Sequence, residues 1–153
     1  MITNCLEDNN LNLANFDDSG YFAGYASVFN VVDYAGDMIL PSSFVGNKID
    51  GVKLLWQHNH QNPIGIVDRV YENEKGLYVE GRIFLALSLG REAYILIQNK
   101  VTDHLSIGYE VIDFYYHEGV RCITKVKLWE VSVVTFPANE FAEVVAVGDQ
   151  STI

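Results

Sequence analysis

Two polar interruptions stand out in a chain whose other segments are mostly apolar and β-branched. The first is Trp56-Gln57-His58-Asn59-His60, and the second is Asp103-His104-Leu105-Ser106-Ile107-Gly108-Tyr109-Glu110. Each breaks a stretch with the composition of a buried strand. A hydroxyl and an imidazole at strand ends are the parts of a serine nucleophile with its general base. We therefore predict Ser106 as the nucleophile and His58 as the base.

Glu130 is the third candidate, because it is a carboxylate inside an apolar strand. Side chains alternate across a strand, so we expect Leu128, Glu130, Ser132 and Val134 to share one face. A buried carboxylate is costly unless a donor reaches it, and an imidazole N–H is such a donor. Glu130 is therefore predicted to orient His58 and to stabilise the imidazolium.

Gly108 lies two residues after Ser106 and is expected on the same face of its strand. A glycine there leaves the backbone open to the close approach of a substrate carbonyl. Backbone N–H groups near Ser106 would supply the oxyanion donors, but the sequence does not identify them.

The same residues allow other interpretations. His60 is a second imidazole beside His58 and a substitute for it as the base. Glu130 could pair with Lys125 or Lys127 instead of a histidine. A serine within a strand is also most often structural, so the spacing alone does not establish a catalytic triad.

A metal site is a further alternative. His58 and His60 at positions i and i+2 point the same way, and His104 or Asp103 could join them. Zinc hydrolases need three such ligands and a base, and no tight ligand motif is present here. We therefore predict no metal and no cofactor, and keep a His-ligated metal hydrolase as the less favoured reading.

Short strand-like runs must position these residues. The expected strands cover residues 21–32, 52–57, 64–71, 77–84, 104–116, 120–126 and 128–136. Apolar residues at helical spacing predict a helix at 89–97 with Ser88 as its N-cap, and Pro41-Ser42-Ser43 predicts a short helix to about Lys48. The fold class expected is mainly β with α: a small, mostly antiparallel closed β-barrel with surrounding helices.

Length and composition limit the remaining possibilities. The 153 residues contain no repeat or linker, so we expect one domain at residues 19–148, an N-terminal arm at 1–18 and a tail at 149–153. A net charge of −10 argues against a nucleic-acid partner. Cys5 and Cys122 form no CxxC pair and are expected as reduced thiols. Neither a signal peptide nor a membrane span is apparent, so a soluble intracellular protein is predicted.

A series of short motifs, each common alone, is specific in its order and spacing. The motifs are Gly24-Tyr25-Ala26-Ser27-Val28-Phe29-Asn30, Asp33-Tyr34-Ala35-Gly36-Asp37, Leu40-Pro41-Ser42-Ser43-Phe44, Leu54-Leu55-Trp56-Gln57-His58, Pro63-Ile64-Gly65, Gly76-Leu77-Tyr78-Val79-Glu80-Gly81, Leu105-Ser106-Ile107-Gly108-Tyr109, Leu128-Trp129-Glu130-Val131-Ser132-Val133-Val134 and Pro137-Ala138-Asn139. Over residues 24–147 the chain resembles the prohead (capsid maturation) serine proteases of tailed bacteriophages.

The resemblance implies a fold and a site. The family shares the fold of herpesvirus assemblin, a small β-barrel ringed by helices. Its histidine matches His58, its serine matches Ser106, and its acidic residue falls at Glu130.

The resemblance also implies a biological setting. Members are serine endopeptidases that cleave the scaffold, or the scaffolding segment of the major capsid protein, and process themselves. The phage scaffolding protein and the major capsid protein are thus the expected partners, and a homo-oligomer stays open. The expected location is the host cytoplasm, inside the immature capsid. A non-catalytic β-barrel that binds scaffold during capsid assembly is the alternative function.

Overall fold

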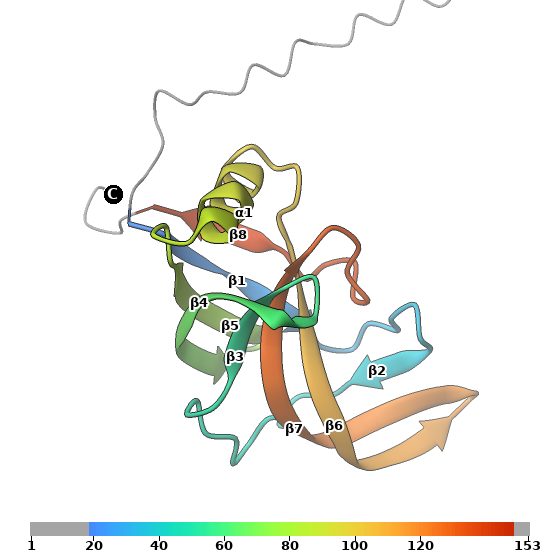
Figure 1. The fold of residues 1–153 in the computed structure, drawn as a ribbon. Coiled ribbons are helices and arrows are strands. Elements are labelled where there is room, and N and C mark those ends of the chain that lie inside the picture. The colour runs from blue at the N-terminus through green and yellow to red at the C-terminus, as the bar shows by residue number, and fades with distance from the viewer. Residues whose placement is uncertain (1–18, 149–153) are drawn as a thin grey trace, which may run out of the picture.

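Eight strands form one continuous sheet in the computed structural model, which describes residues 19–148. The elements in chain order are β1 (Tyr21–Val28), β2 (Asp37–Ile39), β3 (Lys53–Trp56), β4 (Asn59–Glu72), β5 (Gly76–Ile83), α1 (Ser88–Gln98), β6 (His104–His117), β7 (Val120–Val134) and β8 (Val144–Val147). The sheet order is β2-β7-β3-β4-β5-β1-β8, and β6 pairs with the other side of β7 (Figure 1).

Strand β7 is the centre of the arrangement, because it pairs with three other strands. On one side β6 follows it antiparallel from Val120 to Val134. On the other side β2 pairs with it in parallel at 121–123, and β3 pairs in parallel at 130–133. The apolar β-branched composition of β7 suits a strand that is covered on both faces. Glu130 and Ser132 lie in the part shared by β6 and β3.

The gap between β2 and β3 along β7 is filled by a loop instead of a strand. Ser43 accepts a hydrogen bond from the Val126 N–H at 3.0 Å through its carbonyl. The Asn47 side chain donates to the Val126 carbonyl at 2.9 Å and accepts from the Leu128 N–H at 2.8 Å. The amide side chain thus satisfies the backbone groups that a neighbouring strand would otherwise pair.

The predicted closed barrel is wrong, because the sheet stays open between β6 and β8. These two edges approach each other through the isolated bridge between His104 and Glu143. The Asp103 carbonyl accepts from the Val144 N–H at 2.8 Å, and the Leu105 N–H donates to the Ala142 carbonyl at 3.0 Å. Beyond this point β6 and β7 run on away from β8 (Figure 1), with β3 and then β2 paired to the other side of β7.

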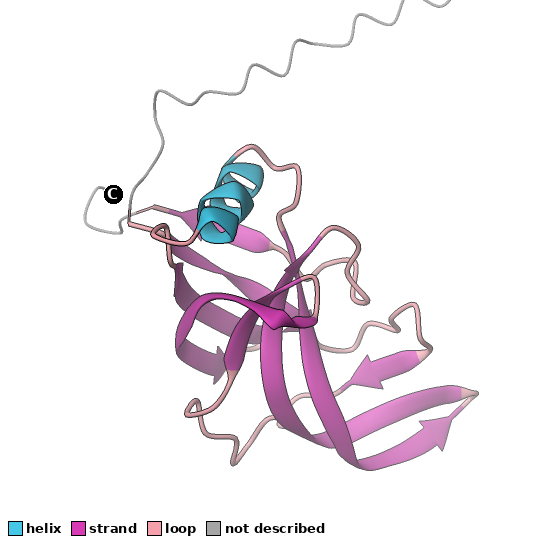
Figure 2. Cartoon of the chain, in the orientation of Figure 1, coloured by secondary structure: helices cyan, strands magenta, loops and turns pink. Residues whose placement is uncertain are grey.

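The prediction of surrounding helices is also wrong for the part of the chain that the structure describes, where α1 is the one helix (Figure 2). Residues 41–46 form turns instead of the expected helix. Helix α1 begins at Ser88, but its N-cap is Leu87 and no side chain caps it. Tyr94 of α1 is fully buried and donates to the Tyr21 carbonyl at 2.7 Å, which holds the helix against the start of β1.

The expected strands are present with changed bounds. The two runs at 120–126 and 128–136 form one strand, β7, and the short strands β2 and β8 were not predicted. The proposed N-terminal arm at 1–18 and the tail at 149–153 lie outside the described residues.

The hydrophobic core includes side chains from seven of the strands and from α1. Its largest fully buried members are Tyr94, Phe22, Leu54, Ile64, Leu77, Ile83, Leu105, Ile123, Val79, Val126, Val131 and Val133. None of the described residues forms a helix with the length and apolarity that crossing a bilayer requires.

A β-bulge in β7 separates Glu130 from the core. Gly108 pairs with Glu130, but Tyr109, the next residue of β6, pairs with Leu128, so β7 carries one extra residue at this point. Leu128 therefore packs in the hydrophobic core, while Glu130 is buried where it contacts His58 and Ser132. The prediction that Leu128 shares a face with Glu130 is wrong, because the extra residue reverses the alternation.

Candidate active site

His58 lies at the tip of the tight hairpin that joins β3 to β4. Trp56 pairs with Asn59, so Gln57 and His58 are the two loop residues, and both are left-handed with φ of +53° and +57°. Two-residue hairpins commonly need positive φ at both positions, and histidine tolerates that region better than most residues do. The hairpin thus presents the imidazole at a fixed point above β7.

Gln57 anchors this tip to the end of β7. Its N–H donates to the Val133 carbonyl at 2.9 Å, and its side-chain amide donates to Thr135 Oγ1 at 2.7 Å. The Thr135 N–H returns a hydrogen bond to the Gln57 side-chain oxygen at 3.2 Å. The left-handed turn is therefore held by several hydrogen bonds, as expected for a strained conformation that persists.

The His58 ring contacts Glu130 directly. Nδ1 lies 2.5 Å from Glu130 Oε1, and the carboxylate is buried with 6% of its side chain exposed, whereas 44% of the imidazole side chain is exposed. An ionised carboxylate only accepts hydrogen bonds, so Nδ1 carries the proton. In the neutral imidazole this arrangement places the lone pair on Nε2, the atom that a general base requires.

Ser132 completes the surroundings of Glu130. Its hydroxyl donates to Glu130 Oε2 at 2.6 Å and accepts from the His58 N–H at 3.1 Å. Both carboxylate oxygens therefore have a partner, which offsets the cost of burying the charge. Strand alternation predicted Ser132 on the face of Glu130 but indicated no role for it.

Ser106 lies directly across the β6–β7 ladder from Ser132. Side chains of opposite residues in an antiparallel pair lie on the same face, with Cβ atoms about 4.5–5.5 Å apart. The register thus brings the predicted nucleophile next to the residue that contacts both His58 and Glu130. Ser106 is 5% exposed, and within residues 19–148 its hydroxyl makes no hydrogen bond to the His58 ring.

Gly108 makes room for the carboxylate. A Cβ at this position would lie 2.5 Å from Glu130 Oε1 and 2.7 Å from Glu130 Cγ. The missing side chain therefore accommodates Glu130, which the sequence pattern did not indicate. The expected opening toward a substrate carbonyl stays a prediction.

The other candidate partners of these residues lie elsewhere. Lys127 Nζ is 3.9 Å from the Trp129 ring centroid, and Lys125 is opposite Asp113 in the ladder. Within the described range, neither lysine forms an ion pair with Glu130. His60 is exposed on β4, and no side-chain hydrogen bond or ion pair of the described residues includes its imidazole.

His104 and Asp103 pair with each other instead of joining the histidines of the hairpin. His104 Nδ1 lies 3.3 Å from Asp103 Oδ1. Between Ser19 and Gly148, no three His, Cys, Asp or Glu side chains converge as metal ligands. The metal alternative thus finds no ligand set in this part of the chain.

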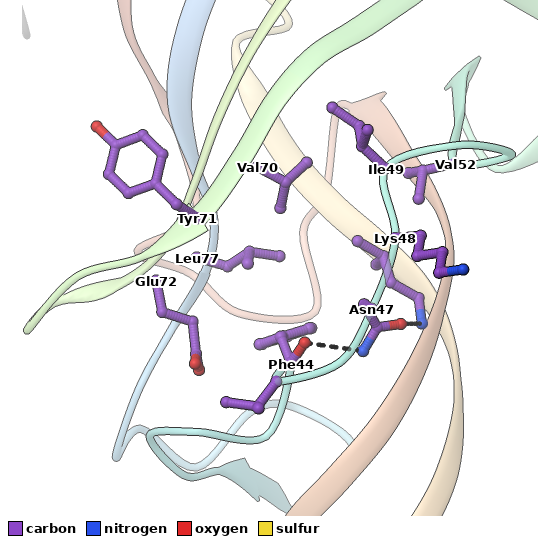
Figure 3. Close-up of a pocket in the computed structure, with 11 residues that line it drawn as sticks. Phe44, Asn47, Lys48, Ile49, Val52, Val70, Tyr71, Glu72 and Leu77 are labelled. Carbon is purple, nitrogen blue, oxygen red and sulfur yellow. Dashed lines mark hydrogen bonds between the residues drawn. The ribbon is translucent and has the colours of Figure 1, made fainter.

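One small pocket lies beside Ser106, and a larger one lies beside the loop at 44–52. The small one of about 30 Å³ includes Ser106, Tyr109 and Asp37 in its lining. The larger pocket of about 190 Å³ lies between the loop at 44–52 and strands β4 and β5, with both apolar residues such as Val70 and polar ones such as Glu72 in its wall (Figure 3). Neither His58 nor Glu130 lines the larger pocket.

Solved structures with the same fold are viral proteases. The KSHV protease, determined in complex with a hexapeptide phosphonate inhibitor, superposes with a TM-score of 0.62 over 84% of this chain and 65% of its own, at 15% identity. The capsid assembly protease of bacteriophage T4 gives a TM-score of 0.59 over 76% of this chain and 82% of its own, at 13% identity. The predicted assemblin-like fold is thus confirmed, without the closed barrel.

Relatives at higher sequence identity come from tailed phages. The prohead protease of Enterobacteria phage HK97 is 37% identical over 83% of this chain, and that of Escherichia phage T5 is 32% identical over 76%. The chain spans 60% and 58% of the length of these two relatives. A capsid polyprotein of Pseudomonas phage PAJU2 is 31% identical over 63% of this chain, which corresponds to 16% of that protein.

The family model described as caudovirus prohead serine protease matches residues 9–152, nearly the whole chain. The resemblance predicted from the ordered motifs is therefore confirmed. This chain belongs to the caudovirus prohead serine protease family.

Proposed function

We propose that this chain is a serine endopeptidase of phage head maturation, with Ser106 as nucleophile, His58 as general base and Glu130 as the residue that orients the imidazole. The contact of 2.5 Å between His58 Nδ1 and Glu130 Oε1 carries the proposal, together with family membership. The ladder partner of Ser106 is Ser132, which contacts both other members.

The geometry suits acyl transfer through a covalent intermediate. Ser106 Oγ attacks the scissile carbonyl while its proton passes to His58 Nε2, and Glu130 stabilises the resulting imidazolium. The imidazolium then protonates the leaving amine, which breaks the peptide bond and leaves an acyl-enzyme. Water, deprotonated by His58, hydrolyses the ester and restores the Ser106 hydroxyl.

The names of the relatives support a substrate that belongs to the assembling capsid. Two of them are prohead proteases and one is a capsid polyprotein. We assign this chain to the prohead, where it would cleave the scaffolding protein or the scaffolding segment of the major capsid protein, and itself. A soluble substrate protein is consistent with a half-exposed imidazole at the tip of a surface hairpin.

Replacement of the nucleophile tests this function. We expect Ser106→Ala to abolish cleavage of the scaffold and of the chain itself, because no hydroxyl is left to form the acyl-enzyme, while the fold is retained. The measurement is mass spectrometry of the chain incubated with its scaffold and capsid proteins, with circular dichroism to monitor folding. Ser88→Ala, which removes an exposed hydroxyl at the start of α1, is the control and should cleave normally.

Three outcomes would contradict the proposal. Cleavage that persists in Ser106→Ala and disappears with a chelator would favour a metal hydrolase. A parent chain that binds scaffold without cleaving it would favour a non-catalytic assembly protein. Loss of activity in His60→Ala, with normal activity in His58→Ala, would move the base to the second imidazole.

A further inference from the structure

The Ser132 hydroxyl occupies a position that the triad alone does not explain. Ser132 is completely buried, and its hydroxyl acts both as a donor and as an acceptor within the site. It donates its proton to Glu130 Oε2 at 2.6 Å and accepts the His58 N–H at 3.1 Å. One oxygen atom thus connects the backbone of the base to the carboxylate that orients the same base.

We propose that Ser132 is a positioning residue for the triad, an inference that rests on the proposed function. The Glu130 carboxylate can rotate, and Oε1 faces His58 Nδ1 only while Oε2 is held elsewhere. Ser132 holds Oε2, so it sets the plane of the carboxylate. The same hydroxyl accepts a hydrogen bond from the His58 N–H and so helps to hold the left-handed turn. The position of the His58 backbone in turn determines the position of its imidazole.

Burial argues against a second nucleophilic serine at this position. The Ser132 side chain is inaccessible, and its proton is already donated to Glu130. Ser106, its partner across the ladder, is slightly exposed and has no such bond to the carboxylate within the described residues. The two serines therefore have separate roles: Ser106 reacts, and Ser132 fixes the groups that activate it.

The sharpest test compares two nearly isosteric replacements, Ser132→Thr and Ser132→Val. Both add carbon to the same buried site, so their packing costs are similar, and only threonine keeps the hydroxyl. The probe is a fluorophosphonate, whose phosphorus bonds to a serine Oγ while fluoride leaves and the serine proton passes to the base. The maximal inactivation rate constant, kinact, reports activation of the nucleophile, and the inhibition constant, KI, reports binding of the probe.

We expect Ser132→Val to lower kinact by about 100-fold with little change in KI, because a small misplacement of a catalytic group has an effect of that order. Ser132→Thr should retain most of the parent kinact. Equal values of kinact for the threonine and valine variants would overturn the inference.

Ser43→Ala is the matched control for a merely structural hydroxyl. Ser43 is also completely buried, and its Oγ lies 2.6 Å from the Leu40 carbonyl and 2.9 Å from the Ile123 carbonyl, away from Glu130. This variant should lose stability and keep kinact. A decrease in kinact as large as that of Ser132→Val would assign the effect to general loosening and overturn the inference.

The site of labelling separates this inference from the proposed function. Peptide mapping should place the phosphonyl group on Ser106 in the parent chain and in both Ser132 variants. Labelling of Ser132 would overturn the positioning role and the assignment of the nucleophile together. Labelling of Ser106 at an unchanged rate in Ser132→Val would overturn the positioning role alone.

Discussion

Gly108 and Glu130 face each other across the β6–β7 ladder, and the carboxylate fills the space that a side chain at position 108 would occupy. This arrangement makes a glycine a determinant of carboxylate position. It also explains why the pair is not apparent from the sequence, because the two residues are 22 positions apart by their numbering and connected only through the register.

We expect Gly108→Ala to lower kinact for a fluorophosphonate by about 100-fold, since the added Cβ displaces the Glu130 carboxylate from His58 Nδ1. The backbone at Gly108 does not require positive φ, so the substitution does not strain the main chain. Thermal unfolding measured alongside should show a folded variant. Parent-like kinact in Gly108→Ala would mean that Glu130 adjusts freely and does not orient the imidazole.

At the level of elements, the loop at 41–52 takes the place of a strand beside β7. Asn47 alone satisfies the Val126 carbonyl and the Leu128 N–H, and its amide also donates to the Phe44 carbonyl at 3.0 Å (Figure 3). The loop thereby fixes β7 immediately before the bulge that separates Leu128 from Glu130. Local breaks in strand pairing are tolerated here because side-chain groups replace backbone ones.

Replacing Asn47 should therefore destabilise the whole sheet. We expect Asn47→Leu to reduce the free energy of unfolding by about 2 kcal/mol, because it leaves a backbone donor and acceptor of β7 without partners. Asn47→Asp keeps the acceptor for the Leu128 N–H and should lose less. Urea denaturation followed by tryptophan fluorescence gives both values, and a leucine variant as stable as the parent would show that water replaces the amide.

The elements could be predicted from the sequence better than their ends or the closure of the sheet. Apolar and β-branched runs predicted the long strands and α1, because periodicity depends on local residues. It could not predict β2, whose three residues pair with β7 more than 80 positions later, or the bulge, which is visible only from the ladder register. The open edge between β6 and β8 likewise depends on where distant segments meet.

For the candidate site too, some features could be predicted from local sequence and others depend on contacts between distant residues. Alternation placed Ser106 with Gly108 on one face of their strand and Glu130 with Ser132 on one face of another, and the motif around His58 supplied the imidazole. The pairing of the two strands came only from the structure. The left-handed conformation of His58 and the bonds made by Ser132 depend on three-dimensional contacts between residues 74 positions apart. No local pattern contains that information.

For the whole molecule, two partly buried tyrosines with raised pKa values predict that stability falls at alkaline pH. Burial raises the pKa of Tyr109 to about 12, and the charges of Asp37 and Asp33 act in the same direction against the opposing charge of Arg121. Burial also raises the pKa of Tyr21 to about 12, followed by the charge of Glu80. In the unfolded chain tyrosine loses its proton near its ordinary pKa of about 10.

The direction in which the free energy of unfolding changes with pH follows from these pKa values. Between about pH 10 and pH 12 the unfolded chain binds fewer protons than the folded one, so the free energy of unfolding falls as pH rises. We expect chemical denaturation at about pH 8, 10 and 11.5, below, at and above the ordinary tyrosine pKa, to show this decline in the free energy of unfolding. In Tyr109→Phe the decline should be shallower, since one of the shifted groups is absent. An identical decline in parent and variant would show that Tyr109 does not contribute.

The order in which the site is translated has a consequence for the nascent chain. His58 precedes Glu130 by 72 residues, and the strand that carries the carboxylate is the longest and among the last elements of the sheet. A polypeptide still on the ribosome thus holds the imidazole and the Ser106 hydroxyl before it holds Glu130 and Ser132. The contacts that organise the imidazole cannot exist until β7 emerges, so assembly of the site is delayed until nearly all of the sheet has been synthesised.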